Sequence, residues 1–195
     1  MNHDVGHAHR LLAPRIAYLI GTKDAEGLAD LIPVSNVTSV STAPQQLAIA
    51  VLKKWRTCEN LFGAEGFTVS VPVAGQLDGV WKLGAKYSGF SVTEPAEKLA
   101  TCGLQLDLNA SPYGPVLLTG IGWASCRLRE RLDFGGDHGV FIGEVGDVWF
   151  NTEHLTSDGT PKTVTRPLMQ QTGNLFTTAA DELVEIPYFS SADGN

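Results

Sequence analysis

Residues 123–150 have the sequence WASCRLRERLDFGGDHGVFIGEVGDVWF, and this stretch decides the fold class. Cys126 and Leu128 alternate with arginines, as in a β-strand that buries one face and exposes the other to water. Residues 135–138 (GGDH) form a turn, and residues 140–150 (VFIGEVGDVWF) return as a second strand. The stretch therefore predicts an antiparallel pair of long strands.

The first strand of this pair is expected to begin at residue 116 and to run, with a bend, to residue 134. Gly120 and Gly122 lie where a barrel strand must bend sharply. Further strands are predicted upstream, at residues 15–22, 32–41, 46–52 and 67–73. The third of these segments is almost continuously apolar, which is typical of a strand covered on both faces. Pro72 is expected to end the fourth or to mark it as an edge strand.

Short helices are expected between the strands, at residues 57–63, 75–84 and 95–101. Thr57 is a good N-cap for the first helix. Leu77, Val80 and Trp81 form an apolar face on the second. Together these elements predict a mainly β fold, a six- or seven-stranded antiparallel β-barrel with a few short helices in its corners.

The chain of 195 residues is 43% hydrophobic, which suits one compact domain with a substantial core. We expect this domain to span residues 13–190 and residues 1–12 to be a flexible N-terminal segment. His3, His7 and His9 of that segment lack the carboxylates and cysteines that would complete a metal site. No metal is therefore expected.

Charge and cysteine content exclude several classes of function. The net charge of −7, without a long basic run, argues against nucleic acid and anionic membranes as partners. Cys58, Cys102 and Cys126 are widely spaced, which argues against a disulfide framework and for a reducing compartment. The sequence has neither an apolar signal segment nor an apolar run of about 18–20 residues that could span a bilayer. A cytoplasmic protein without membrane contact is expected.

Polar side chains concentrate in residues 35–60 and 86–88, where hydroxyls, amides and lysines gather. The sequence contains no P-loop, dinucleotide-binding, zinc-ligand or nucleophile-elbow motif. Groups of this kind can hold a phosphate and a polar heteroaromatic ring without making or breaking bonds themselves. The pattern predicts a cofactor that carries its own chemistry.

Residues 53–60 (KKWRTCEN) indicate where the phosphate would bind. Lys53, Lys54 and Arg56 precede a helix whose first N–H groups, together with the Thr57 hydroxyl, would attract an anion. The alternative is a solvated basic loop followed by an ordinary helix cap.

Asn36, Thr38 and Ser39 make the predicted strand at residues 32–41 too polar for a plain core strand. In one interpretation, these side chains simply face water. In the other, their backbone and side-chain groups bond the edge of a flavin ring and its ribityl hydroxyls.

Several segments, in order along the chain, resemble the flavin reductase-like family. They are residues 15–22 (RIAYLIGT), 32–41 (IPVSNVTSVS), 56–61 (RTCENL), 67–72 (FTVSVP), 136–138 (GDH) and 142–145 (IGEV). Four further segments resemble the flavoredoxin branch of the family: residues 84–90 (GAKYSGF), 103–104 (GL), 166–168 (RPL) and 175–176 (LF). The resemblance spans roughly residues 12 to 188.

The resemblance implies the FMN-binding split barrel, a Greek-key β-barrel that forms homodimers with flavin sites near the subunit boundary. On matching positions, the residues implied to line the flavin ring and ribityl chain are Asn36, Val37, Thr38 and Ser39. Those implied for the phosphate end are Lys54, Thr57 and Asn60. Those implied to reach the pocket from its other side, from the same or the partner subunit, are Lys86, Tyr87 and Ser88.

His138 matches a family histidine that is linked to nicotinamide binding. Without the resemblance, a turn histidine beside Asp137 is more simply an exposed polar residue. Two positions depart from the family pattern, since many members have Asn at the position of Ser70 and a bulkier residue at that of Asn36. The hydrogen bonds around the flavin are therefore expected to differ somewhat from those of the family.

The resemblance implies an FMN-dependent oxidoreductase in which NADH or NADPH reduces the flavin. The reduced flavin would then pass electrons to a monooxygenase or another redox protein. One alternative is a non-enzymatic FMN electron carrier, and another is a flavin-free structural or sensor domain. Recognition of the 2′-phosphate of NADPH needs a placed arginine. The candidates are Arg127, Arg129 and Arg131, for which the only argument is that there are three of them.

Overall fold

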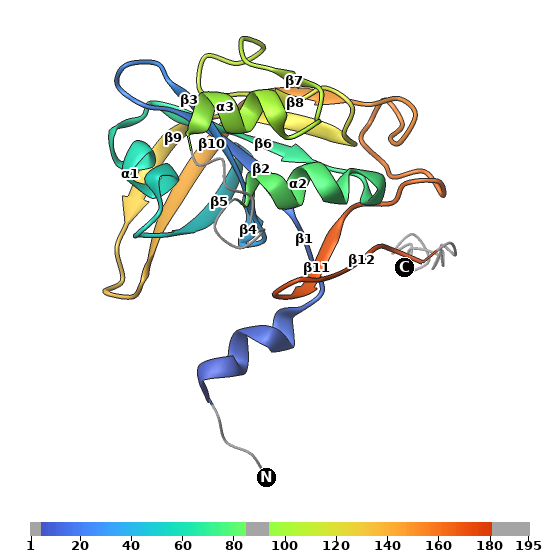
Figure 1. Cartoon of the computed structure of the whole chain (residues 1–195), viewed down its shortest axis with the longest axis horizontal. Helices are drawn as coiled ribbons and strands as arrows, with labels where there is room; N and C mark the ends of the chain where they lie inside the picture. The colour runs from blue at the N-terminus through green and yellow to red at the C-terminus, as the bar shows by residue number, and fades with distance from the viewer. Residues whose placement is uncertain (1–4, 85–93, 181–195) are drawn as a thin grey trace, which may run out of the picture.

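The computed structural model describes residues 5–84 and 94–180. In this part of the chain the largest element is a seven-stranded antiparallel sheet with the order β3-β2-β6-β9-β10-β5-β4 (Figure 1). Its strands are β2 (Tyr18–Lys23), β3 (Ala29–Val34), β4 (Val37–Thr42), β5 (Gln45–Leu52), β6 (Gly66–Val71), β9 (Gly122–Leu132) and β10 (His138–Phe150). The prediction of a mainly β fold with six or seven antiparallel strands is confirmed.

Strands β9 and β10 form the predicted antiparallel pair, from Leu132 opposite Val140 to Gly122 opposite Phe150, with register shifts between Ile142 and Gly143 and between Val145 and Asp147. Along β9, Leu128 is buried while its neighbours Arg127 and Arg129 face solvent, as the alternation predicts. Because β9 also pairs with β6 and β10 also pairs with β5, this hairpin lies in the interior of the sheet.

The prediction of one strand over residues 116–134 is wrong. A short β8 (Val116–Leu117) comes first and pairs with β7 (Leu106–Asp107), and β9 begins only at Gly122. Between β8 and β9 the chain packs against the end of β6, where a Cβ at Gly120 would lie 2.6 Å from the carbonyl oxygen of Val71. The next N–H group, that of Ile121, donates to the same carbonyl over 2.7 Å.

The single strand predicted over residues 32–41 is also wrong. β3 ends at Val34, β4 begins at Val37, and the two lie at opposite ends of the sheet order. The carbonyl of Asn36, between them, accepts a hydrogen bond of 2.9 Å from the N–H of Ala50 in β5. The chain therefore leaves β2 at this point and joins β5.

Two further strand predictions need correction. The segment 15–22 is split at Ala17 into β1 (Arg15–Ile16) and β2, because the Ala17 N–H donates to the carbonyl of Leu168 instead of to the sheet. In β5 only Ile49 and Val51 are buried, so the strand is not covered on both faces. β6 ends at Val71, which confirms Pro72 as its stop.

The helices lie where they were predicted: α1 (Arg56–Gly63), a 3-10 turn η2 (Ala74–Gln76) continued by α2 (Leu77–Leu83), and α3 (Pro95–Thr101). The N-cap prediction is wrong, because Trp55 is the cap of α1 and Thr57 lies inside the helix. The Thr57 side chain is buried, with 1% of its surface exposed. Its hydroxyl therefore points into the protein and cannot cap the helix end.

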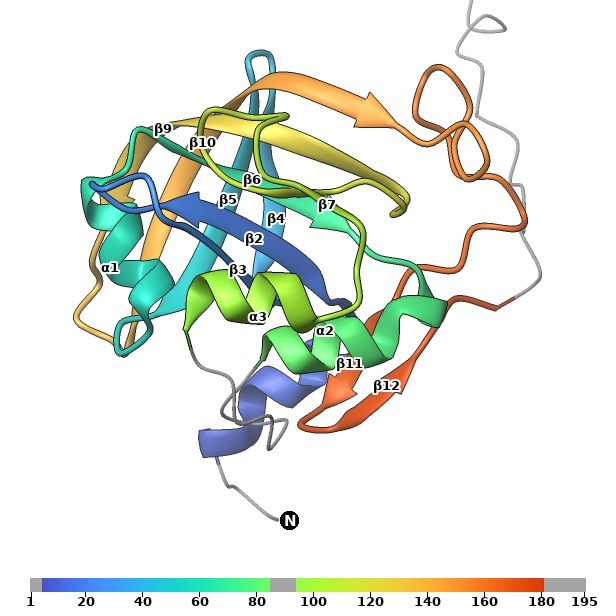
Figure 2. The ribbon, with the colours of Figure 1, turned by 45° about the horizontal axis from the view of Figure 1, so that its top comes forward.

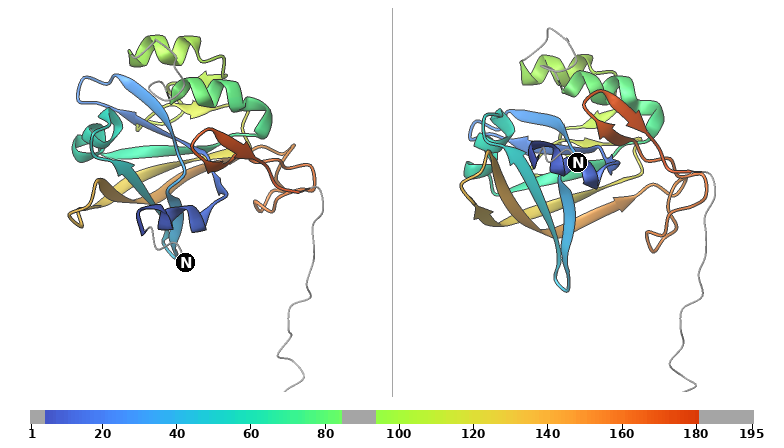
Figure 3. Two further views of the ribbon diagram at one scale, coloured as in Figure 1. Left: turned by 60° about the horizontal axis from the view of Figure 1, so that its bottom comes forward. Right: turned by 90° about the horizontal axis from the view of Figure 1, so that it is seen from below.

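The remaining elements lie outside the main sheet. Near the C-terminus, β11 (Met169–Thr172) and β12 (Leu175–Thr177) form a hairpin, which pairs with β1 in a small sheet and lies beside α2 (Figure 2). A 3-10 helix, η1 (Val5–Leu12), has no buried residue and extends away from the sheet in Figure 1, whereas in the views of Figure 3 it overlaps the sheet. Residues 5–12 thus have regular structure, and their flexibility stays a prediction.

Two hydrophobic cores flank strands β2 and β3. One lies among β2, β5, β6, β9, β10 and α1, and includes Ile20, Phe67 and Phe141. The other lies between the same two strands and helices α2 and α3, and includes Leu31 and Leu83. Helices α2 and α3 are therefore packed against β3, which is an edge strand of the main sheet. Among the described residues, no helix has the length and apolar character needed to cross a membrane.

Candidate functional site

A cavity of about 750 Å³ opens where the ends of β3 and β5 meet the start of α1, helices α2 and α3, and the β11–β12 hairpin. Its wall is part apolar, with Ile32, Val34, Val80 and Leu83. Polar side chains come from separate parts of the chain: Asp30, Asn36, Lys54, Thr57, Lys98, His138 and Asn174. An apolar cavity of this size with a few convergent polar groups is typical of a small-molecule site.

A buried polar cluster of Asp30, Thr57 and Lys98 forms one wall of the cavity. The Lys98 Nζ donates to Oδ1 of Asp30 over 2.7 Å, and the Thr57 hydroxyl donates to Oδ2 over 2.8 Å. The exposed fractions are 3% for Asp30 and 5% for Lys98. Because a buried charge is tolerated only when paired, the two ions hold β3 and α3 together.

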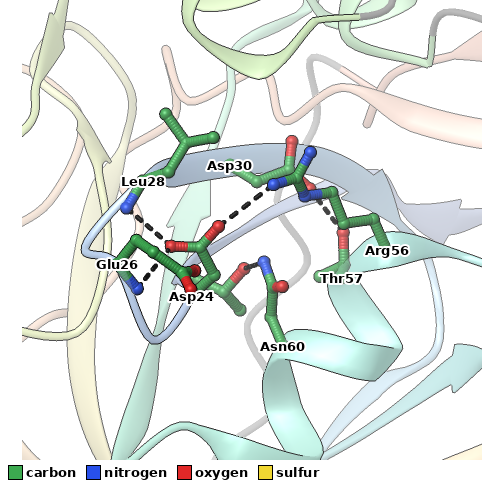
Figure 4. Close-up of polar contacts among 8 residues, drawn as sticks. Asp24, Glu26, Leu28, Asp30, Arg56, Thr57 and Asn60 are labelled. Carbon is green, nitrogen blue, oxygen red and sulfur yellow. Dashed lines mark hydrogen bonds and ion pairs between the residues drawn. The ribbon is translucent and has the colours of Figure 1, made fainter.

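The start of α1 forms the rim. Arg56 forms an ion pair with Asp24. The Asp24 carboxylate also accepts hydrogen bonds from the N–H groups of Glu26 and Leu28 (Figure 4). The N–H of Leu28, followed by Arg56, holds the pKa of Asp24 below its usual range. Lys53 forms an ion pair with Asp133, with 2.7 Å between its Nζ and the Oδ1 of Asp133.

Lys54 differs from these two neighbouring cations. It is exposed, it lines the cavity, and within the described residues it forms no ion pair. At the start of α1, the N–H of Cys58 donates to the carbonyl of Trp55 over 2.9 Å, whereas the N–H groups of Arg56 and Thr57 have no backbone acceptor within the described residues. Lys54 and the first turn of α1 therefore combine one cation with free backbone donors at the cavity rim, as an anion site requires.

Aromatic rings form another wall of the cavity. The Trp81 ring from α2 meets the Phe176 ring from β12 edge to face, with 5.7 Å between ring centroids. Both rings line the cavity, as does Trp55 at the cap of α1. The same cavity thus offers a planar heteroaromatic ligand both aromatic rings and hydrogen-bonding groups.

His138 is half-buried and lines the cavity at the first position of β10, so it belongs to a strand and not to the predicted turn. Its Nδ1 lies 2.6 Å from Oδ1 of Asp137. This contact holds the pKa of Asp137 below its usual range. It also fixes the ring so that Nε2 is the nitrogen available to a ligand.

Of the other predicted site residues, Asn36 lines the cavity and its Oδ1 accepts a hydrogen bond of 2.6 Å from Arg15. Val37, Thr38 and Ser39 lie on the edge strand β4 and do not line the cavity. Thr38 and Ser39 are exposed. The structure therefore separates these three from Asn36, their neighbour in the sequence.

Asn60 points away from the cavity. Its amide donates to the Thr22 hydroxyl over 3.1 Å inside the protein (Figure 4), and it borders a second, more open groove of about 1020 Å³. Lys86, Tyr87 and Ser88 lie outside the described residues. Gly84 and Pro95, which come before and after that segment in the sequence, both line the cavity.

Sequence reasoning missed Asp30, Lys98, Trp81 and Phe176 as site residues. One signal was present, because Asp30 is the only charged residue in the segment ADLIPV that became β3. An acidic residue inside a buried strand needs a partner, which predicts a nearby cation. The identity of that cation depends on how α3 packs, which the sequence does not indicate.

Comparison with known proteins identifies what the chain is similar to. Residues 10–179 match the family model of the flavin reductase like domain. An uncharacterised protein of Pyrococcus abyssi (strain GE5 / Orsay) is 26% identical over 137 residues, which are 70% of this chain and 74% of the relative.

Solved structures with a similar fold include an FMN-binding protein from Thermus thermophilus with bound 1-cyclohex-2-enone. It has a TM-score of 0.74 and 25% identity, over 89% of this chain and 90% of the other. A split barrel domain protein from Shewanella frigidimarina NCIMB 400 has a TM-score of 0.78 and 19% identity, over 97% of this chain and 100% of the other. The predicted split-barrel fold is confirmed.

Proposed function

Because the chain belongs to the flavin reductase-like domain family, we propose that it binds FMN in the cavity beside α1 and α2 and works as an oxidoreductase. NADH or NADPH would supply the electrons, and a monooxygenase or another redox protein would receive them. Bound FMN would supply the redox chemistry, accepting hydride and passing electrons on. The protein's part is to bind and orient the two nucleotides.

The residues of the cavity fit this cofactor. Its volume of about 750 Å³ falls in the range of sites for small molecules and cofactors. Its aromatic wall of Trp81 and Phe176 suits a flat ring, Trp55 adds a third ring beside α1, and its polar side chains offer hydrogen bonds. A cation stands at the rim, where a phosphate can remain partly hydrated. The observation that best supports the proposal is that aromatic rings, hydrogen-bonding groups and a cation line the same cavity.

We assign the phosphate to Lys54 and the first N–H groups of α1. Among the described residues Lys54 forms no ion pair, although its charge is a minor cause of the lowered pKa of Asp137, while Lys53 and Arg56 are each paired with an aspartate. The Thr57 hydroxyl already donates to Asp30, so Thr57 contributes its backbone N–H and not its side chain. The Asn60 side chain is bonded to Thr22 and takes no part in this assignment.

His138 is the candidate for nicotinamide contact. It reaches the cavity from β10, opposite the end of β5, and Asp137 holds its ring in place. A histidine fixed in this way can donate or accept a hydrogen bond through Nε2 to the carboxamide of a nicotinamide. Its replacement by Ala is expected to raise the KM for NADH or NADPH with little change in FMN affinity.

We further propose that the protein is a homodimer and resides in the cytoplasm. Strand β4 ends the sheet order, so among the described residues one of its edges has no partner strand. Val148, Trp149 and Phe150 of β10 are exposed apolar residues, which suits an interface between copies. The three cysteines are free and buried, as in a reducing compartment. A pure monomer with full flavin content in sedimentation velocity would exclude the dimer.

The test of the phosphate assignment is Lys54→Met, with Lys53→Met as the matched control. Lys54→Met is expected to weaken FMN binding about tenfold, the effect of losing a hydrogen bond to a charged group. Riboflavin, which has no phosphate, should bind equally well to this variant and to the unmodified protein. Lys53→Met should change neither affinity. Equal losses of FMN affinity in both variants would refute the assignment.

Rapid mixing with NADH and NADPH separates the enzyme from the alternative of a non-enzymatic FMN electron carrier. In the enzyme, one of the two nucleotides should bleach the flavin absorbance quickly when the protein is saturated with FMN. In a carrier, neither nucleotide should do so. The same experiment shows which nicotinamide is preferred.

A further inference from the structure

The buried cluster of Asp30, Thr57 and Lys98 is placed for ligand binding, because all three residues line the cavity. Their exposed fractions are 3%, 1% and 5%, so little solvent reaches them except through the cavity. The charges of Asp30 and Lys98 cancel within a contact of 2.7 Å. The cluster is therefore polar but carries no net charge.

Hydrogen-bonding capacity remains on each member of the cluster. The Lys98 ammonium has three donors and gives one of them to Asp30, and within the described residues no other acceptor is bonded to it. Each oxygen of the Asp30 carboxylate accepts one bond and can accept another. The Thr57 oxygen donates its proton to Asp30 and keeps its own lone pairs. The cavity wall thus offers donors and acceptors side by side.

This mixture selects one class of chemical group. A phosphate offers only acceptors and would be repelled by the Asp30 carboxylate. The face of a flat aromatic ring would leave the remaining donors of Lys98 without partners, which is costly in a buried site. The heteroatom edge of a flavin ring could bond them, but the position of the cluster beside the first turn of α1 favours the part of the flavin next to the phosphate. A hydroxyl both donates and accepts, so a row of hydroxyls satisfies the cluster.

The position of the cluster agrees with the covalent structure of FMN. Thr57 follows Arg56 directly, so the cluster adjoins the first turn of α1, where the phosphate is assigned. In FMN the phosphate is attached to the ribityl chain, and the chain is attached to the ring. A phosphate at the α1 rim and a ring on the aromatic wall would bring the ribityl hydroxyls between them.

We propose that Asp30, Thr57 and Lys98 form the subsite for the ribityl hydroxyls of the flavin. This inference rests on the proposed FMN binding. It assigns these residues to binding, with no role in catalysis. They distinguish a flavin that carries a polyol chain from a bare ring, whereas Lys54 distinguishes FMN from riboflavin.

The test compares the affinities of three flavins by fluorescence titration: FMN, riboflavin, and lumiflavin, which lacks the ribityl chain. The unmodified protein should bind riboflavin at least about tenfold more tightly than lumiflavin, since several buried hydrogen bonds depend on the chain. In the paired variant Asp30→Asn/Lys98→Met, this preference should fall to near one. The ratio of FMN to riboflavin affinity should stay unchanged in that variant.

The paired substitution is chosen because either single change would leave a buried charge without its partner. Thr57→Val is a second variant that keeps the ion pair and removes only the hydroxyl. It should weaken riboflavin binding severalfold and leave lumiflavin binding unchanged.

The outcomes separate the two proposals. If the unmodified protein binds none of the three flavins, the proposed function fails. If it binds FMN but shows no preference for riboflavin over lumiflavin, the subsite is refuted and FMN binding stands. An unchanged preference in folded Thr57→Val and paired variants, with circular dichroism as the check of folding, also overturns the subsite.

Discussion

The indole of Trp81 and the ring of Phe176 meet edge to face, with 5.7 Å between their centroids. This contact joins helix α2 to the C-terminal hairpin, and both rings also line the cavity. Within the described residues, the hairpin also pairs with the short strand β1. The aromatic pair therefore couples the position of the hairpin to the shape of the cavity.

We expect Phe176→Ala to weaken FMN binding and to speed hydrogen exchange in the amides of β11 and β12. An edge-to-face pair contributes about 0.5–1.5 kcal/mol beyond the apolar area that it buries. Leu175→Ala is the matched control, because Leu175 lies on the same strand with 58% of its surface exposed. If both variants bind FMN like the unmodified protein, the hairpin is not a wall of the flavin site.

The ion pair of Asp30 and Lys98 should be needed for stability as well as for binding. Lys98→Met leaves the Asp30 carboxylate buried without a counter-ion and is expected to lower the free energy of unfolding by about 3–5 kcal/mol. Lys82→Met on the neighbouring helix α2 disrupts the surface ion pair with Asp78 and should cost less than about 1 kcal/mol. Urea unfolding of both variants measures the difference. Equal stability of the two would mean that the Asp30 site is hydrated.

The cysteines should be inert in the folded protein. Cys58, Cys102 and Cys126 are free and buried, and burial raises the pKa of Cys126 to about 12 and raises that of Cys58. Since the thiolate is the reactive form, a thiol reagent at mildly alkaline pH should label the native protein very slowly. In denaturant, all three cysteines should react at once. Rapid labelling of a cysteine in the native protein would contradict the packing described for it.

Asp24 should make the protein less stable in acid. The N–H of Leu28, followed by Arg56, lowers the pKa of Asp24 from its usual value of 3.8. The resulting stabilisation is present above that value and is lost as the pH falls through the lower pKa of the folded state. Asp24→Asn should therefore lose less stability on acidification than the unmodified protein does. The measurement is urea unfolding at neutral and acidic pH, with the exposed neighbour Glu26→Gln as control.

Much of the fold could be predicted from local patterns. The alternation around Cys126 and Leu128 predicts β9, because a half-buried strand must alternate between apolar and polar residues. The helix at residues 95–101 also occurs with those bounds. The breaks at Ala17, at residues 35–36 and near Gly120 could not be predicted. Each depends on a backbone partner distant in the sequence, such as Leu168, Ala50 or Val71.

The candidate site was predicted only in part. Lys54, Asn36, Thr57 and His138 do meet at one cavity, because the polar segments follow strands that end at the same place. The role of the Thr57 side chain was misjudged, since a threonine at a helix start resembles a cap when its burial is unknown. Lys98 and Phe176 could not be predicted, because they reach the cavity only through the packing of α3 and of the C-terminal hairpin.

Titration of the purified protein with FMN, followed by the visible absorption and fluorescence of the flavin, tests the central claim most directly. We predict a saturable complex of one FMN for each chain, with quenched fluorescence and shifted absorption bands, and with lower affinity in Lys54→Met. No change in the flavin spectrum at any protein concentration, with the protein folded, would contradict the claim that this cavity is a flavin site.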